Sequence, residues 1–237
     1  MTDLSLNPDF FDKPPAALAV ALLGKVLRRK VSTSDGDFWL AARIIETEAY
    51  YLQEKGSHSS LGFTEKRKAM FMAPGTIYMY YARGGDSLNF SAKGQGNGVL
   101  IKSGFPWFDA LSPEANLPVM QALNPGTQGP RPVTRLCNGQ TLICKSLGLK
   151  VPDWNQQRLD PERFRLEAPD KGISEYIQTS RLGIPEGRDH HLPLRFIETA
   201  LARHATRNPM TVRNAREGVD YFRRAGGEAP IPLPEVE

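Results

Sequence analysis

The spacing of apolar and polar positions changes several times along this chain of 237 residues, and each change predicts a different element. Residues 16–24 (AALAVALLG) form an apolar run after two prolines, which predicts a helix with Asp12 as a candidate N-cap and Gly24 at its end. Residues 25–31 (KVLRRKV) begin a strand, and the turn SDGD returns the chain into a long second strand, FWLAARIIETEAYY (38–51). The chain therefore opens with a helix followed by a β-hairpin.

Glycine-rich turns divide residues 75–104 into three predicted strands. Gly84 and Gly85 offer a two-residue hairpin turn, because glycine accepts positive φ at low cost. The second connection, GQGNG (94–98), is looser. It is not a dinucleotide-binding fingerprint, because a strand rather than a helix follows it.

Helix and strand signals alternate in the second half of the chain. Residues 112–123 predict a helix, and residues 133–149 predict a second helical region that Gly139 interrupts. Patterning typical of strands returns in residues 163–169 and 181–198. The tail is basic and then proline-rich, and we expect it to be disordered from about residue 224.

Composition narrows the class of protein but not its function. Hydrophobic residues make up 40% and charged residues 24% of the chain, which is typical of a soluble globular protein and not of a disordered or fibrous one. The net charge of +4 permits a polyanionic partner without requiring one. No secretory signal is visible and the longest apolar run is too short to cross a bilayer, so we expect no membrane association. Cys137 and Cys144 are expected to be half-buried thiols in a reducing, cytoplasmic compartment.

One short stretch, IIETEAYY (44–51), places two carboxylates in an otherwise strand-like run. In a strand, Glu46, Glu48 and Tyr50 share one face, because side chains alternate between the two sides of a sheet. The simplest interpretation is a solvated face, since antiparallel sheets commonly expose one side to water. The alternative is that the acids and the aromatic ring serve a common site.

Several motifs together favour the second interpretation: RIIETEAYY (43–51), a nearby His-Ser pair (58–59), MFMAPGTIYMY (70–80), LNFSAKGQGNGVLIK (88–102) and PLRF (193–196). With these motifs the chain resembles the alkyladenine DNA glycosylase family, the mammalian type of 3-methyladenine DNA glycosylase. The resemblance runs from about residue 10 to about residue 196 and is densest between 43 and 102. Because the sequence shows no repeat and no clear linker, we expect a single mixed α/β (α+β) domain over residues 1–237. We expect it to have a curved, largely antiparallel β core, flanking helices and a protruding β-hairpin.

The resemblance also implies an activity and a set of site residues. Such an enzyme flips a damaged purine out of duplex DNA and hydrolyses its N-glycosidic bond, without a metal or another cofactor. Glu48 matches the general base that activates water, and it would also stabilise positive charge on the sugar. Tyr50 and His58 match opposing walls of the base pocket, and Tyr80 matches its third aromatic residue. Asn89 matches the residue that crowds a guanine amino group and so favours adenine-like lesions.

The sequence departs from the family pattern at two positions. Arg83 stands where the family has a hairpin-tip Tyr that fills the gap left by the flipped nucleotide, so Tyr81 becomes the alternative plug. Lys102 stands where the family usually has an Arg that binds DNA phosphate, which keeps the charge but loses the bidentate fork.

Other candidate residues receive simpler interpretations. We expect a structural or electrostatic role for Glu46, such as raising the pKa of Glu48 as a like-charge neighbour. Tyr78 is interpreted as a packed β-former. Arg188, His190 and His191 are interpreted as part of a loop, because no nearby ligand pattern supports a metal site.

The sequence therefore predicts a monofunctional DNA N-glycosylase that leaves an abasic site, acts on damaged double-stranded DNA and is a monomer. "Monofunctional" depends on the absence of a pocket lysine at the Glu48 position. We expect the enzyme in the cytoplasm, associated with the nucleoid in a prokaryote, or in the nucleus of a eukaryote. Two alternatives stay open: a module that binds damaged DNA without cleaving it, and a related hydrolase of RNA or nucleosides.

Overall fold

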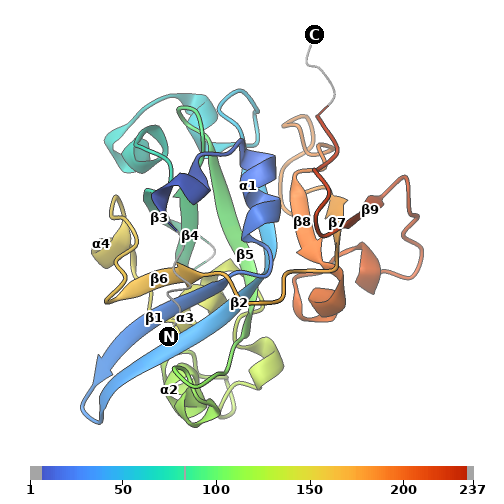
Figure 1. The fold of residues 1–237 in the computed structure, drawn as a ribbon. Helices are drawn as coiled ribbons and strands as arrows, with labels where there is room; N and C mark the ends of the chain where they lie inside the picture. Colours follow the sequence, from blue (N-terminus) through green and yellow to red (C-terminus); the bar gives the residue numbers. More distant parts are fainter. Residues whose placement is uncertain (1–6, 83, 234–237) are drawn as a thin grey trace.

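The structure is a computed structural model that describes residues 7–82 and 84–233. Its described strands form one sheet in the order β3-β4-β5-β2-β8-β7-β9, and β1 pairs with both β2 and β6 (Figure 1). Every pair of neighbouring strands is antiparallel. The strands are β1 Val26–Thr33, β2 Gly36–Tyr50, β3 Ile77–Ala82, β4 Gly85–Ser91, β5 Gly98–Pro106, β6 Phe164–Glu167, β7 Glu175–Thr179, β8 Arg195–Glu198 and β9 Tyr221–Ala225. The predicted α+β class, with a largely antiparallel core, is confirmed.

Short helices surround the sheet (Figure 1). Helix α1 packs on β2 and β5, and α3 packs on β4 and β5. Their bounds are α1 Pro15–Leu22, α2 Leu117–Leu123, α3 Gln140–Ser146 and α4 Val151–Trp154. The 3-10 segments are η1 Pro8–Phe11, η2 His58–Leu61, η3 Glu65–Phe71, η4 Glu114–Asn116, η5 Val133–Arg135, η6 Thr199–His204 and η7 Pro209–Thr211. None of the described helices is long and apolar enough to cross a membrane.

Strand β2 is the longest described strand, and it joins the two halves of the sheet. Its first half pairs with β1, and its second half lies between β5 and β8. The register between β2 and β5 shifts on both sides of Glu46, so that Ile45 on β2 and Lys102 on β5 lack a direct partner. Such bulges bend a strand and redirect its side chains. They occur here beside the two carboxylates of the ETEAY motif.

Two local predictions in the N-terminal half need correction. Pro14, not Asp12, precedes α1, because Asp12 ends the separate segment η1. Gly24 follows the helix with φ of +77°, as predicted for its end. Gly84 and Gly85 do not form the turn together, because Gly85 already belongs to β4 and pairs with Ala82. Gly85 is needed within the strand for another reason: a Cβ there would lie 3.0 Å from Cβ of Thr141 on α3.

The C-terminal half differs more from the prediction. Within 181–198 only Arg195–Glu198 is a strand, and β7 and β9 were not predicted. Strand β9 extends to Ala225, and the described tail beyond it contacts β7. Gln178 of β7 donates to the carbonyl of Ile231 at 3.1 Å and accepts from its amide at 2.8 Å. Residues 234–237 lie outside the described residues.

Cys137 and Cys144 are free thiols, as predicted, but they are fully buried rather than half-buried. Burial raises the pKa of Cys137 to about 12 and also raises the pKa of Cys144. Both thiols therefore act as small apolar core groups at neutral pH.

Candidate active site

A cavity of about 170 Å³ opens between the strands around β2 and the loops near residues 57 and 183. Its floor and walls come from β2, β3, β4 and β5, and the N-terminus of α3 closes one side. The lining residues are Tyr50, Gly56, Ser57, His58, Met70, Tyr78, Tyr80, Ala82, Asn89, Leu100, Lys102, Gln140, Leu182, Gly183 and Ile184. The structure thus brings together Tyr50, His58, Tyr80 and Asn89, the four residues predicted to form a base pocket.

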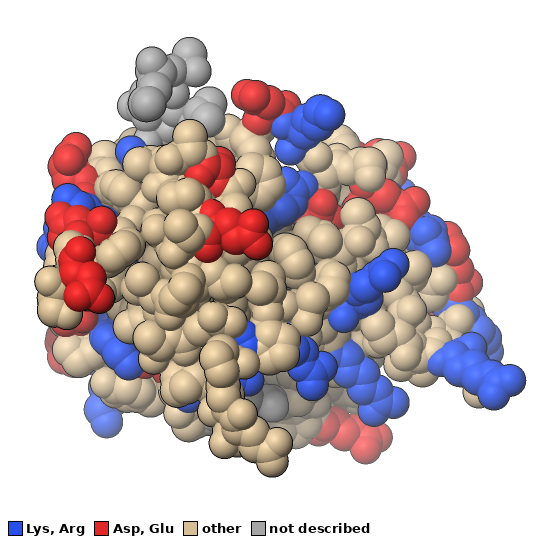
Figure 2. Space-filling model, turned by 90° about the horizontal axis from the view of Figure 1, so that it is seen from below, with Lys and Arg blue, Asp and Glu red and all other residues tan. Residues whose placement is uncertain are grey.

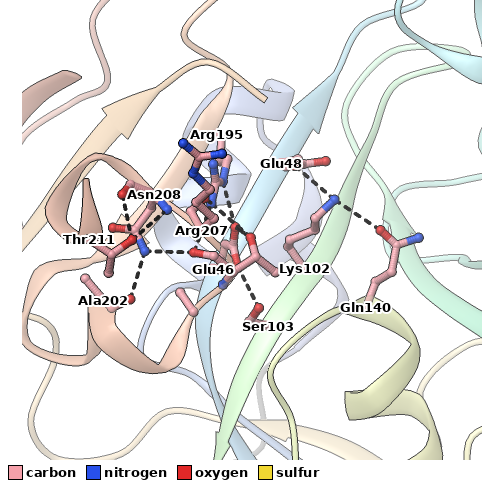
Figure 3. A network of polar contacts seen from close by, with 12 residues as sticks. Glu46, Glu48, Lys102, Ser103, Gln140, Arg195, Ala202, Arg207, Asn208 and Thr211 are labelled. Carbon is pink, nitrogen blue, oxygen red and sulfur yellow. Dashed lines mark hydrogen bonds and ion pairs between the residues drawn. The ribbon is translucent and has the colours of Figure 1, made fainter. Parts of the chain in front are cut away.

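Glu48 is fully buried beside this cavity, so the interpretation of its strand face as solvated is wrong. Its Oε2 accepts a hydrogen bond from the Tyr50 hydroxyl at 2.7 Å, and its Oε1 lies 3.2 Å from Nζ of Lys102. Lys102 also donates to Oε1 of Gln140 at 3.2 Å (Figure 3). The Gln140 amide in turn donates to Ser87 at 2.8 Å. A cation and a phenol therefore offset the cost of burying this carboxylate.

Lys102 stands where the family usually has an Arg that binds DNA phosphate, and the structure places it in the wall of the cavity. Its side chain is buried, lines the cavity and pairs with Glu48. The bulge in β5 at Lys102 explains this placement, because a residue without a direct partner can turn its side chain toward the neighbouring strand. A phosphate contact by Lys102 stays a prediction.

Tyr50 is a neutral hydrogen-bond donor with one face of its ring covered. Burial raises its pKa well above 10.0, and the charge of Glu48 raises it further. The Arg181 guanidinium lies 4.6 Å from the ring centroid and donates to the Ala49 carbonyl at 3.0 Å and to Glu54 at 2.5 Å. Arg181 thus fixes the ring from behind, which leaves the other face for the cavity.

The remaining aromatic residues form one connected wall. The rings of His58 and Tyr80 meet edge to face with centroids 4.5 Å apart, and Tyr78 stacks on Tyr80 at 5.3 Å. Tyr78 therefore lines the cavity rather than serving only as a packed β-former. Asn89, on the adjacent strand, donates from Nδ2 to the Tyr78 carbonyl at 3.1 Å. This bond holds the Asn89 side chain at the cavity wall.

Burial lowers the pKa of His58 below its usual 6.5, and the charges of Arg67 and Arg188 lower it further. The imidazole in the wall is consequently neutral at pH 7. A neutral ring is suited to stack beside a cationic base, whereas an imidazolium would repel it.

Glu46 belongs to a separate buried network (Figure 3). Its carboxylate accepts from Nε of Arg195 at 2.6 Å, from the Ser103 hydroxyl at 2.6 Å, and from both the amide and the hydroxyl of Thr206 at 3.0 and 2.7 Å. Burial alone would raise the pKa of Glu46, but the Arg195 charge and these hydrogen bonds outweigh it and lower the pKa below 4.5. Glu46 is thus a structural residue whose charge is balanced locally by Arg195.

The predicted DNA-contact residues of the hairpin have different outcomes. Tyr81 is 67% exposed near the tip of the β3–β4 hairpin, which leaves its ring open to a partner. Arg83 lies outside the described residues. The choice between the two as the residue that fills the gap of a flipped nucleotide stays a prediction.

Sequence reasoning missed several lining residues. Gln140 follows Gly139 at the start of α3. Residues 182–184, in the loop between β7 and β8, also line the cavity. No local pattern marks either of them, because they enter the site only through the packing of α3 and of the loop before β8. The described part of the chain contains no cluster of three or more His, Cys, Asp or Glu side chains that could hold a metal ion.

The geometry defines a class of site: a buried carboxylate, held by a lysine and a tyrosine, beside an aromatic cavity suited to a planar base. The model of the methylpurine-DNA glycosylase family matches residues 9–201. This is most of the chain, and the chain belongs to this family. The resemblance inferred from the motifs is thereby confirmed.

Relatives of the chain support the same assignment. A Pseudomonas aeruginosa protein named "Putative 3-methyladenine DNA glycosylase" is 60% identical over 216 residues, which cover 90% of this chain and 88% of that protein. A protein of the same name from Pseudomonas syringae pv. tomato is 59% identical over 92% of this chain and 96% of its own length. The "DNA-3-methyladenine glycosylase" of Rattus norvegicus is 35% identical over 81% of this chain and 60% of its own length.

We predict that Glu46→Gln lowers the free energy of unfolding by about 3–5 kcal/mol at pH 7, because it leaves the buried Arg195 charge without its partner. The stabilisation exists above the unfolded-state pKa and is lost as pH falls through the lowered pKa of Glu46. Denaturant unfolding between pH 7 and pH 3 should therefore show the wild type and the variant converging at low pH. The exposed Glu162→Gln is the control and should match the wild type throughout. A pH-independent gap would contradict an ionised Glu46.

Proposed function

We propose that this protein flips an alkylated or deaminated purine out of damaged double-stranded DNA and hydrolyses its N-glycosidic bond, leaving an abasic site. The observation that carries the proposal is the buried Glu48 beside an aromatic cavity, in a chain of the methylpurine-DNA glycosylase family. We further propose that it acts as a monomer and without a cofactor. We expect it at the nucleoid of a prokaryotic cell or in the nucleus of a eukaryotic cell.

The aromatic wall supports the flipping step on energetic grounds. Extruding a base costs a few kcal/mol, and least for a damaged or mispaired base. Stacking on an aromatic side chain returns roughly 1–3 kcal/mol per base, and a cationic purine gains a cation–π contribution as well. Tyr50 and the His58–Tyr80 pair offer such surfaces on two sides of the cavity.

Glu48 is proposed to act in the bond-breaking step. The water oxygen attacks C1′ of the sugar, the bond between C1′ and the purine nitrogen breaks, and the purine leaves with the bonding electrons. The water gives its proton to Glu48, whose negative charge also stabilises the oxocarbenium-like transition state. Tyr50 holds one carboxylate oxygen, and Lys102 holds the other. A phosphate of the bound nucleotide would give Lys102 a second acceptor and release that oxygen to the water.

A water nucleophile needs a further argument, because the cavity does contain a lysine. The Lys102 nitrogen is already engaged by the Glu48 carboxylate and by Oε1 of Gln140, so it is not placed as a free nucleophile for C1′. We therefore retain a monofunctional glycosylase, which does not cut the DNA strand.

Two alternative functions make different predictions. A protein that only binds damaged DNA has no need for a buried, ion-paired carboxylate at the cavity, and Glu48 disfavours this alternative. A hydrolase of RNA or nucleosides would show no preference for duplex DNA, so competition between duplex and single-stranded substrates distinguishes it.

We predict that the wild type releases free 3-methyladenine from methylated duplex DNA and that Glu48→Gln is slower by about 10²–10⁴-fold, because the variant cannot accept the proton. Single-turnover release measured by chromatography tests this, with Glu162→Gln as a matched control that should retain full activity. The wild type and Glu48→Gln should both still bind a duplex that carries a tetrahydrofuran abasic analogue. Tight binding without release by the wild type would favour the non-cleaving alternative.

We also predict that hypoxanthine is excised more slowly than 3-methyladenine under single-turnover conditions. Hypoxanthine is neutral and well stacked, so its excision depends more on a wedge, and Arg83 replaces the aromatic wedge of the family. Equal rates for the two lesions would contradict the prediction. Arg83→Ala is the companion test, since unchanged affinity and excision would remove Arg83 from the DNA interface.

The neutral state of His58 predicts a pH effect that depends on the charge of the lesion. As pH falls below 6.5 toward the lowered pKa of His58, the imidazole becomes charged and repels a cationic base. Excision of 3-methyladenine should therefore fall more steeply on the acidic side than excision of hypoxanthine. In His58→Gln, which cannot be protonated, the two pH profiles should become parallel. Parallel profiles already in the wild type would rule out this role for His58.

A further inference from the structure

A run of basic side chains follows the last residues that the family model matches. Residues 203–216, here called the cationic segment, contain Arg203, Arg207, Arg213 and Arg216, all exposed. No acidic residue occurs between Glu198 and Glu217. Viewed from below, basic side chains gather on the side of the molecule where η6 and η7 lie (Figure 2). The segment is thus a surface of one charge sign.

Most of this charge has no partner within the described protein. Arg216 pairs with Asp220 at 3.5 Å. Arg203, Arg207 and Arg213 form no ion pair with any acidic residue in the ranges that the structure describes. Exposed arginines without acidic neighbours attract polyanions, and a guanidinium can bind phosphate through two parallel hydrogen bonds.

The cationic segment is fixed to the sheet by the Glu46 network (Figure 3). Glu46 accepts from the amide and hydroxyl of Thr206, and Nη2 of Arg195 donates to the carbonyl of Arg207 at 2.8 Å. Asn208 donates to the carbonyls of Ala202 and Thr206, each at 2.8 Å, and caps η7. The backbone of the segment is therefore held by the buried pair of Glu46 and Arg195. Glu46 lies on β2, two residues before Glu48.

The segment also adjoins the cavity itself. The Asn138 side chain, two residues before Gln140 of the cavity, donates to the carbonyl of Ala205 at 3.1 Å. Leu182 lines both the cavity and a neighbouring groove of about 780 Å³, which Arg207 lines as well. A DNA strand that delivers a nucleotide to the cavity would pass close to Arg207, at the start of the segment's exposed loop.

We propose that the cationic segment, whose backbone the Glu46–Arg195 network holds in place, binds phosphates of the DNA duplex next to the flipped nucleotide. This inference rests on the proposed function, because it takes duplex DNA as the substrate. It assigns the region after residue 201, beyond the match to the family model, to substrate binding.

The test compares two triple variants by fluorescence anisotropy, with a duplex that carries one tetrahydrofuran abasic analogue. Arg203→Ala/Arg207→Ala/Arg213→Ala removes three charges from the segment. Lys30→Ala/Lys93→Ala/Lys171→Ala removes three charges from other elements. Each lost phosphate contact lowers the slope of log K against log salt by about 0.9. We expect the segment variant to lose about 2–3 units of slope and roughly tenfold or more of affinity at low salt.

The control variant should keep the affinity and slope of the wild type, and both variants should keep its melting temperature, because the changed side chains are exposed or half-exposed. Equal losses in both variants, or no loss in the segment variant, would overturn the proposal. Release of 3-methyladenine by the wild type is measured in parallel. Its absence would refute the proposed activity alone, since the binding comparison decides the role of the segment independently.

Discussion

The structure depends on the burial of two carboxylates, two residues apart on one strand. An uncompensated buried charge costs several kcal/mol, so Glu46 and Glu48 each require a cation that is also buried. Strand β8 supplies Arg195 to Glu46, and the bulged strand β5 supplies Lys102 to Glu48. The two strands that flank β2 are thereby tied to it through side chains as well as through the backbone.

The two ion pairs have different surroundings, and this separates their roles. Each carboxylate oxygen of Glu46 accepts two hydrogen bonds, from Arg195, Ser103 and Thr206. Such a fully bonded carboxylate suits a permanent structural contact. Glu48 has fewer partners, a lysine and a tyrosine hydroxyl, and it lies at a cavity. A carboxylate with a replaceable partner at a cavity is the one that can exchange its contact for a water molecule. One strand thus carries both a structural carboxylate and the carboxylate that we propose to be catalytic.

Much of the site could be predicted from short motifs. The ETEAY and TIYMY motifs lie on strands, where alternation determines which side chains face the same way. Tyr50 and Tyr80 line the cavity, and Glu48 contacts Tyr50 and Lys102 of its lining. Prediction was weaker where position depends on contacts between distant segments. Nothing near Arg181 in the sequence indicates that it covers Tyr50, and nothing near Gln140 indicates that it contacts Lys102, because these contacts join residues far apart in the chain.

The sequence by itself determined the family, the order of most elements and the identity of the carboxylate beside the pocket, because these depend on local alternation and on motif resemblance. Only the tertiary structure decided that both acids are buried, that Lys102 turns into the cavity, and that the tail forms β9 and holds Gln178. The reason is that burial and charge compensation are properties of the packed sheet. Strand alternation predicts which residues share a face. The neighbouring strands determine whether that face is exposed to water or packed against a cationic side chain such as Arg195 or Lys102.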